Sequence, residues 1–317
     1  MIAFRLLVRF ALSLVILTMF PVLAFAQSSA EAGNIIFASD SKASTFPFEF
    51  RKGMIFIPVH INGSKPLSFV LDTGSSRILI DRALAGDLGL KANGSGSLQG
   101  AGSGRIPIEF IHGVRLAFPG VESGGYDLST TDLKPLEQSL GVKVDGILGY
   151  EVLSRFVVTV NYEGKNLTFT LPQAFHPDNK AQQLPIEIRD KWPFVKAELV
   201  LPGPVTVQDS FMIDSGSSDA VDHPVVMKLQ SRVASESGIG FGKPIRGGTA
   251  RADSFRIGRY TLDGPIVSCC GATDATSKLI GSEVLRRFNV TFDYPSSRIF
   301  ISPNSSFGEG ALSVTLQ

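Results

Sequence analysis

The sequence contains few of the side chains that form disulfides or hold metal ions. Its 317 residues include two cysteines and four histidines. The cysteines, Cys269 and Cys270, are neighbours, and consecutive Cα atoms lie about 3.8 Å apart, below the usual disulfide range of about 4.4–6.8 Å. We therefore expect two reduced, buried thiols, with a strained bridge between them as the alternative. The histidines are scattered and form no zinc motif, so neither a metal nor another cofactor is expected.

An excess of charge is also absent. Thirty basic and 29 acidic residues leave a formal net charge of +1, and lysine and arginine do not gather in runs. A nucleic-acid partner or a charged membrane surface is therefore not expected. The chain also lacks the G-x-S-x-G and H-E-x-x-H patterns of serine and metal hydrolases, which makes those two enzyme classes distant alternatives.

The first 26 residues have the pattern of a signal peptide. Two arginines, Arg5 and Arg9, precede the apolar residues 10–20, and residues 24–26, Ala-Phe-Ala, supply a cleavage site. Cleavage there would yield an exported protein, periplasmic or extracellular, and a bacterial source is expected. An uncleaved membrane anchor is the alternative, but Pro21 interrupts a run that is short for a span of about 20 residues. After cleavage no membrane association is expected.

The chain from residue 47 onward has the pattern of β-structure. Short apolar and β-branched runs alternate with Gly, Asn and Pro turns, as in the hairpin predicted for residues 54–72. Helices are expected to be few and short. Residues 173–183 lose apolar content and are expected to link two domains. The predicted fold class is all-β.

The sequence after this linker repeats the sequence before it. Phe-Val-Leu-Asp-Thr-Gly-Ser-Ser at 69–76 is matched by Phe-Met-Ile-Asp-Ser-Gly-Ser-Ser at 211–218. Residues 147–162 align without gaps to residues 279–294, at an offset of 132 (283 − 151 for the matched glutamates). Each half thus has an Asp-Thr/Ser-Gly-Ser-Ser loop and, later, two apolar residues, a glycine, a predicted short helix and a strand. This internal repeat predicts two homologous units.

These paired motifs resemble the signatures of the pepsin-like and retropepsin-like aspartic peptidases. The resemblance covers roughly residues 46–303 and is strongest at the two Asp loops. It implies a bilobal, single-chain fold of two β-barrel-like lobes with few short helices. It also implies that the loops meet at a pseudo-twofold axis and that Asp72 and Asp214 are the catalytic residues.

Two facing carboxyl groups have a chemical use. They do not readily ionise together, so one pKa rises and the pair shares a proton. One member then takes a proton from water while the other hydrogen-bonds the scissile carbonyl. The predicted function is an aspartic endopeptidase without a covalent intermediate, and the expected partner is a peptide or an unfolded protein. Because such a pair titrates as a unit, the proton is not assigned to one residue.

The residues that follow the two aspartates have supporting roles implied by the resemblance. They are Thr73, Gly74 and Ser75 in the first loop, and Ser215, Gly216 and Ser217 in the second. In the family the first hydroxyl of each loop braces the loops across the interface, and the glycine allows close approach. The serine after the glycine hydrogen-bonds the outer oxygen of the aspartate, with plain turn formation as the alternative.

A flap that closes over the substrate is expected near residues 98–110. Its tip would be formed by Gly100, Gly102 and Gly104, where pepsin-like members carry a tyrosine. A second glycine-rich candidate lies at residues 238–248. Neither stretch completes a phosphate-loop pattern, so both are interpreted as flaps or flexible loops.

The expected organisation is a signal peptide (1–26), a flexible segment (27–46), an N-terminal lobe (47–172), a linker (173–183), a C-terminal lobe (184–303) and a tail (304–317). Because a single chain supplies both Asp loops, a monomer is expected. A catalytically silent peptide- or protein-binding module on the same fold is the alternative function.

Several other charged residues receive structural interpretations. Asp145, Asp219 and Asp222 are expected to organise turns or a helix entry. Arg155 and Arg287, at matching positions of the repeat, are expected to be solvent-exposed helix residues.

Overall fold

The computed structural model describes residues 34–99, 105–203, 205–240, 243–270 and 278–310. The predicted signal peptide, the last seven residues and the glycines Gly100, Gly102 and Gly104 lie outside the described residues. Within the described ranges, no helix is long and apolar enough to cross a membrane.

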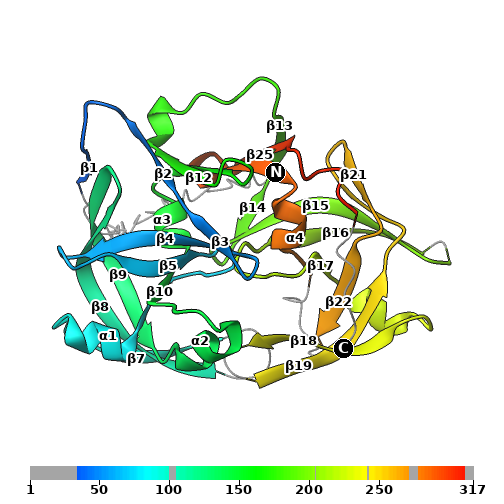
Figure 1. Cartoon of the computed structure of the whole chain (residues 1–317), viewed down its shortest axis with the longest axis horizontal. Helices are drawn as coiled ribbons and strands as arrows, with labels where there is room; N and C mark the ends of the chain where they lie inside the picture. The colour runs from blue at the N-terminus through cyan, green and yellow to red at the C-terminus, as the bar shows by residue number, and fades with distance from the viewer. Residues whose placement is uncertain (1–33, 100–104, 204, 241–242, 271–277, 311–317) are drawn as a thin grey trace, which may run out of the picture. The chain divides into compact units, whose positions relative to one another are not determined.

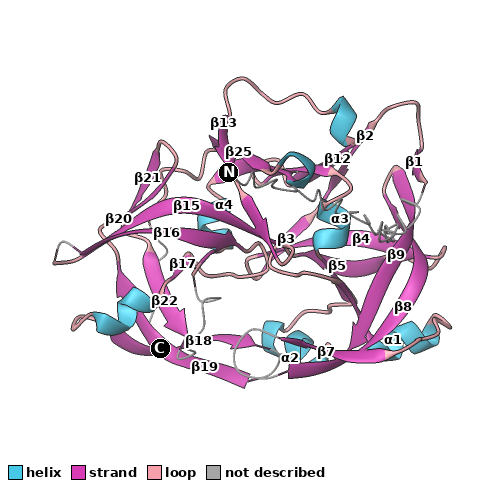
Figure 2. Cartoon of the chain, turned by 180° about the vertical axis from the view of Figure 1, so that it is seen from behind, coloured by secondary structure: helices cyan, strands magenta, loops and turns pink. Residues whose placement is uncertain are grey.

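The fold is all-β, as predicted, and its helices are short. The α-helices of the described residues are α1 (Arg82–Asp87), α2 (Lys134–Leu140), α3 (Tyr150–Leu153) and α4 (Ser282–Leu285). Short 3-10 helices of the described residues are η1 (Pro172–Ala174), η2 (Pro224–Lys228) and η4 (Tyr294–Ser296). The strands form three sheets, seen from opposite sides in Figures 1 and 2.

Each half of the chain builds one large sheet. The nine-stranded N-terminal sheet contains β1 (Ile35–Phe37), β3 (Glu49–Arg51), β4 (Met54–Ile61), β5 (Leu67–Leu71), β6 (Ile78–Asp81), β7 (Ser95–Gln99), β8 (Arg105–Phe118), β9 (Val121–Thr131) and β10 (Gly146–Leu148). The ten-stranded C-terminal sheet contains β14 (Glu187–Arg189), β15 (Trp192–Leu201), β16 (Val205–Ile213), β17 (Val221–Asp222), β18 (Val233–Gly240), β19 (Lys243–Arg251), β20 (Ser254–Ile257), β21 (Tyr260–Asp263), β22 (Ile266–Cys270) and β23 (Leu279–Ile280).

The third sheet combines strands from both halves. It has six strands: β2 (Ala43–Pro47), β11 (Val157–Asn161), β12 (Asn166–Thr170), β13 (Gln182–Pro185), β24 (Phe288–Asp293) and β25 (Arg298–Pro303). Figure 1 shows its strands β12, β13 and β25 at the top, between the two large sheets. At its centre β11 pairs antiparallel with β24, its counterpart in the sequence repeat.

An approximate twofold axis passes between these two central strands. Thr159 lies directly opposite Thr291, and their hydroxyl oxygens are 3.0 Å apart. The two threonines are separated by 132 residues, the same offset as the sequence repeat. Because equivalent residues of the two repeats meet each other, the halves are related by rotation about this point.

The same strand pattern surrounds both Asp loops. In the N-terminal half, β10 lies between β5, to which it is parallel, and β6, to which it is antiparallel. In the C-terminal half, β23 lies between β16 and β17 with the same directions. The predicted apolar-apolar-Gly segments are therefore the central strands beneath the loops, and α3 and α4 follow them as predicted.

Ordered structure begins earlier than the sequence pattern indicated. Residues 27–46 were expected to be flexible, but residues 35–37 form β1 and residues 43–47 form β2. The cause is burial at the end of this segment: Phe46 is 3 % exposed and packs edge-on against Phe169, 5.3 Å between ring centroids. A polar composition therefore concealed two edge strands.

Candidate active site

Asp72 and Asp214 stand at equivalent ends of equivalent strands. Asp72 follows β5 and donates its main-chain N–H to Leu148 O, 2.9 Å away. Asp214 follows β16 and donates its N–H to Ile280 O, also at 2.9 Å. The carboxylate Oδ1 of each aspartate accepts from the glycine two residues later, Gly74 at 2.8 Å and Gly216 at 2.9 Å. The central strand of each sheet thus holds one aspartate.

Four crossed hydrogen bonds join the two loops. Thr73 N donates to Ser215 Oγ (3.0 Å), and Ser215 N donates to Thr73 Oγ1 (2.9 Å). Each hydroxyl in turn donates to the main chain of the opposite half: Thr73 Oγ1 to Ile213 O (2.7 Å) and Ser215 Oγ to Leu71 O (2.8 Å). Both side chains are buried. Every donor and acceptor in this network is satisfied, so the network fixes one loop against the other.

The glycines of the two loops lie against the opposite carboxyl groups. A Cβ at Gly74 would stand 2.6 Å from Asp214 Cγ, and a Cβ at Gly216 would stand 2.6 Å from Asp72 Oδ1. Real Cβ atoms do not approach other atoms this closely. Each loop therefore needs glycine because the other loop's aspartate occupies the space of a side chain.

The electrostatics of the two aspartates are coupled. Burial raises the pKa of Asp72 well above its ordinary value, and the charge of Asp214 and a hydrogen bond with its carboxyl raise it further. Burial also raises the pKa of Asp214, against the opposing effect of its hydrogen bonds to Asp72 and to the N–H groups of Gly216 and Ser217. Both carboxyls thus favour protonation, and a pair of this kind retains one proton between its members.

The two serines after the glycines do not bond as expected. The Ser75 hydroxyl donates to Arg77 O at 2.8 Å, and the Ser217 hydroxyl accepts from Asp219 N at 3.3 Å. The main-chain N–H groups of both serines, together with those of the preceding glycines, lower the pKa of Asp72 and Asp214, and the hydrogen bond with Asp72 also lowers that of Asp214. The hydroxyls therefore shape the turns, which was the alternative interpretation.

Two β-hairpins extend on the same side of the sheets. The hairpin of β7 and β8 contains the predicted flap region, and the hairpin of β18 and β19 contains residues 238–248, the second candidate. Figure 1 shows the two hairpins at the bottom, directed toward each other, with α2 beside β18. Strand β18 contacts α2, so the C-terminal hairpin reaches the N-terminal half.

One acidic residue near the pair was misinterpreted from the sequence. Asp222 was expected in a turn, but it lies in β17 and is 9 % exposed. Burial and the charges of Asp219 and Asp214 raise its pKa well above the ordinary value, and burial and Asp214 raise that of Asp219. A charged residue within the apolar run Ala-Val-Asp-His was the signal that could have indicated a buried acid.

Tyr294 is a further residue that sequence reasoning missed. Its side chain is 5 % exposed, and its hydroxyl has no hydrogen-bond partner among the described residues. Burial raises its pKa well above the ordinary value, and the negative charges of Asp72 and Asp214 add to the effect. The Tyr294 hydroxyl therefore lies within electrostatic reach of both aspartates.

Arg155 and Arg287 differ from their predicted exposure. Arg287 is 5 % exposed and its guanidinium bonds Glu283 Oε1 at 2.8 Å. Arg155 donates to Gly124 O at 2.6 Å and lies 3.8 Å above the ring of Tyr126. Both arginines therefore make specific contacts with the protein beside α3 and α4.

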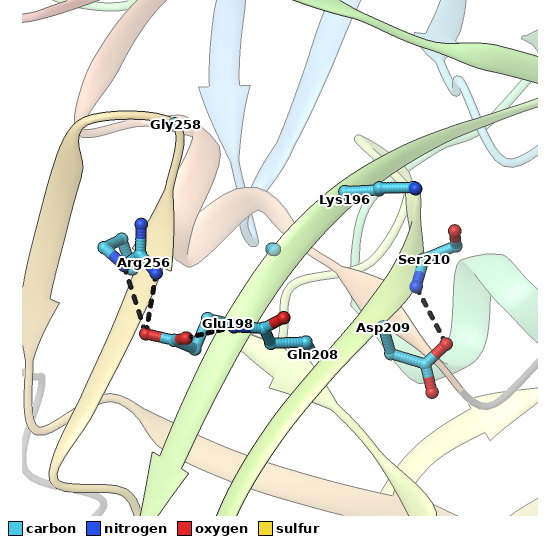
Figure 3. Close-up of a pocket in the computed structure, with 8 residues that line it drawn as sticks. Lys196, Glu198, Gln208, Asp209, Ser210, Arg256 and Gly258 are labelled. Atoms are coloured by element: carbon cyan, nitrogen blue, oxygen red, sulfur yellow. Dashed lines mark hydrogen bonds and ion pairs between the residues drawn. The ribbon is translucent and has the colours of Figure 1, made fainter.

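A hollow of about 520 Å³ lies elsewhere, on strands β15, β16 and β20 (Figure 3). Glu198, one of its charged residues, bonds Arg256 at 2.9 Å and Gln208 at 2.8 Å. Neither Asp72 nor Asp214 lines it. The coupled aspartates are thus the stronger candidate for chemistry.

The donor set within the described residues does not suggest a metal centre, since no group of three or more His, Cys, Asp or Glu side chains is arranged to hold an ion. Residues 57–152 match the model of a family described as Aspartyl protease. No curated protein matches the chain. The family match covers the first Asp loop and its central strand, and it supports an aspartyl protease family and a general protease function for this chain.

Proposed function

Starting from a chain that matches an aspartyl protease family, we propose that it is an endopeptidase that uses Asp72 and Asp214 as one catalytic unit. The observation that carries the proposal is the pair of crossed loops, in which each glycine lies against the opposite carboxyl. Raised pKa values at both aspartates support a shared proton. The pair then contains one acid and one base at the same pH.

The proposed mechanism is general acid–base hydrolysis. The ionised carboxyl takes a proton from a water molecule, whose oxygen attacks the scissile carbonyl carbon, while the protonated carboxyl donates a hydrogen bond to the carbonyl oxygen. The tetrahedral intermediate then expels the amine, which receives a proton from the pair. The network of Thr73 and Ser215 keeps the carboxyls in place without reorganisation during the reaction.

The cellular setting belongs to the same proposal. The pattern of residues 1–26 supports export to the periplasm or the exterior, where the enzyme would act on peptides or unfolded proteins. Since both Asp loops come from one chain, the active unit is a monomer. No observation specifically favours the silent binding module, because both aspartates and both glycines are present.

Cleavage of an unstructured protein and of a broad peptide library, between about pH 3 and pH 8, tests the proposal because this range brackets the titration of a carboxyl pair. We expect hydrolysis that a statine-type inhibitor blocks, since its hydroxyl resembles the tetrahedral intermediate and transition-state mimics bind far more tightly than substrates. A folded preparation that hydrolyses nothing across this range would overturn it.

A further inference from the structure

We infer that the two halves of the site select different side chains, and that Asp222 makes the C-terminal half select a lysine or arginine of the substrate beside the scissile bond. The inference rests on the proposed peptidase function and names the substrate class for the same site. It follows from comparing equivalent side chains of the two sheets.

The two sheets present equivalent rows of side chains. Within a row, residues on neighbouring strands lie directly opposite each other, so their side chains point to the same face. The N-terminal row consists of Phe56, Val70, Ile147, Leu79 and Ser129. The C-terminal row consists of Phe194, Met212, Leu279, Asp222 and Ser268. The rows match in character at every position except one, where Asp222 stands in the place of Leu79.

Both rows lie on the face that carries the catalytic carboxyls. Val70 and Met212 stand two residues before Asp72 and Asp214, whose N–H groups continue the hydrogen bonding of the strands to Leu148 O and Ile280 O. Side chains two residues apart in such a segment point to the same face. Leu98 of the β7–β8 hairpin packs against the cluster that contains the N-terminal row. A peptide held between the hairpins and the aspartates would therefore lie over the N-terminal row on one side of the scissile bond and over the C-terminal row on the other.

The C-terminal row contains an unpaired acid in apolar surroundings. Asp222 is 9 % exposed, and its Oδ1 has no hydrogen-bond partner within the described part of the chain. Its row neighbours Leu279 and Phe194 are half-buried, whereas Ile147 and Phe56 in the N-terminal row are buried. A buried carboxyl without a partner is unfavourable unless a partner arrives. The missing partner is a cationic hydrogen-bond donor.

The loops beside the rows also differ in charge, and the C-terminal loop is again the acidic one. Asp219 and Arg77 are equivalent, because the main-chain oxygen of each lies beneath the glycine that ends the central strand, Gly281 or Gly149. The C-terminal side therefore carries two acids, and the N-terminal side carries Arg77, whose guanidinium lies 5.4 Å from the centre of the Phe110 ring. The C-terminal side therefore attracts a cation of the substrate, and the N-terminal side repels it.

The side chains of lysine and arginine suit this row. Their methylene stems cover apolar surface such as Phe194 and Met212 while the charged head reaches a carboxylate. A site with a buried polar group discriminates strongly against a ligand that leaves the group unpaired. The preference therefore depends on the charged head rather than on the length of the side chain.

Among the side chains that the structure describes, none that is cationic neutralises Asp222. The groups that face it are Asp219 and Asp214, and the two nearby basic residues are directed elsewhere: Lys278 Nζ lies 2.7 Å from Asp209 Oδ2, and His223 Nε2 lies 3.4 Å from the same oxygen. The strand partner on β22, Ser268, is uncharged. Since burial and these two acids raise the pKa of Asp222, the preference for a cation is expected to strengthen as pH rises through that pKa.

The test compares peptides that differ at one position. A cleavable peptide with an apolar pair at the scissile bond is synthesised with lysine, or with norleucine, which has the same chain without the ammonium, at each of three positions on either side. For the wild-type enzyme we expect kcat/KM to favour lysine by about 10- to 100-fold at a position on one side only. The variant Asp222→Leu, which copies Leu79, should reduce this ratio to below about threefold and still cleave the norleucine peptide.

Two further variants complete the design. Asp222→Asn keeps the shape of the side chain and should also lose the preference, which covers the case in which Asp222→Leu does not fold. Asp263→Asn, an exposed acid of the same half, should keep it. The inference is wrong if the wild-type enzyme cleaves the peptides without preferring lysine, or if both Asp222 variants retain the preference. Failure to cleave any peptide would instead refute the peptidase proposal itself.

Discussion

The Asp72 loop and the Asp214 loop share the hydrogen bonds that hold the aspartates and brace the loops, but their electrostatic surroundings differ. Each holds its aspartate with a glycine N–H, and each sends one hydroxyl across to the opposite half. Around the first loop stand Arg77 and an apolar row, whereas the buried Asp222 and the half-buried Asp219 accompany the second. The parts that must fit each other across the axis are equivalent. The parts that would face a substrate have diverged.

The largest effect is expected from substituting either of the two equivalent aspartates. Asp72→Asn and Asp214→Asn should each lower kcat/KM by at least about 10²- to 10⁴-fold, since the amide removes the acid–base function while preserving volume. Peptide cleavage kinetics measure the loss, and circular dichroism shows whether the fold is kept. Near wild-type turnover in either variant would show that the two loops do not work as a unit.

The close approach of the loops is expected to be the next most sensitive feature. Gly74→Ala and Gly216→Ala place a Cβ against the opposite carboxyl, so we expect at least about 100-fold lower kcat/KM from its displacement and a loss of about 1–3 kcal/mol of unfolding free energy. Gly86→Ala is the matched control, because nothing lies within 4 Å of its Cβ position. Equal behaviour of all three variants would contradict the crossed-loop geometry.

The bracing hydroxyls should have a smaller effect, mainly on stability. Thr73→Ala and Ser215→Ala each remove a buried hydroxyl and leave an opposite N–H without its acceptor, at a cost of about 1–3 kcal/mol. Chemical denaturation of the two single variants and the double variant measures their coupling, which we expect to be about 0.5–3 kcal/mol. Strictly additive losses would mean that the residues do not share one network.

The smallest expected effect concerns the acids that occur only beside the second loop. A buried acid with a raised pKa binds its proton more tightly in the folded state, so it lowers stability as pH rises above its unfolded pKa. Asp222→Asn should therefore unfold at a higher temperature than the wild type at neutral pH and at a similar temperature at the acidic end. Thermal unfolding from about pH 3 to pH 7 checks this, with Asp263→Asn as the exposed control.

Local patterns of the sequence were sufficient to predict much of the site. The Asp-Thr/Ser-Gly-Ser-Ser loops, the hairpins before them and the short helices after the central strands are each coded by adjacent residues. The repeat then indicated which segments are equivalent. These features depend on few residues that are close in sequence, so the all-β class could be predicted from the sequence.

The surroundings of the pair could not be predicted in this way because they depend on register. Leu79 stands seven residues after Asp72, whereas Asp222 stands eight after Asp214, yet both pair with the central strand at equivalent positions. A gapless comparison of the loops therefore aligns Leu79 with Val221 and misses the buried acid. The burial of Arg287 was missed for a different reason. Its partner Glu283 comes within hydrogen-bond distance of the guanidinium only once α4 has formed.

The pH dependence of kcat/KM for a peptide without titratable side chains tests the central claim most directly. If Asp72 and Asp214 act as one unit with one shared proton, the profile between about pH 3 and pH 8 is a bell with an acidic and a basic limb, and its two apparent pKa values belong to the pair. Because both aspartate pKa values are raised, the basic limb should lie above the ordinary titration range of an isolated aspartate. A profile that only rises with pH, or that stays flat through the carboxyl range, would contradict the shared-proton pair.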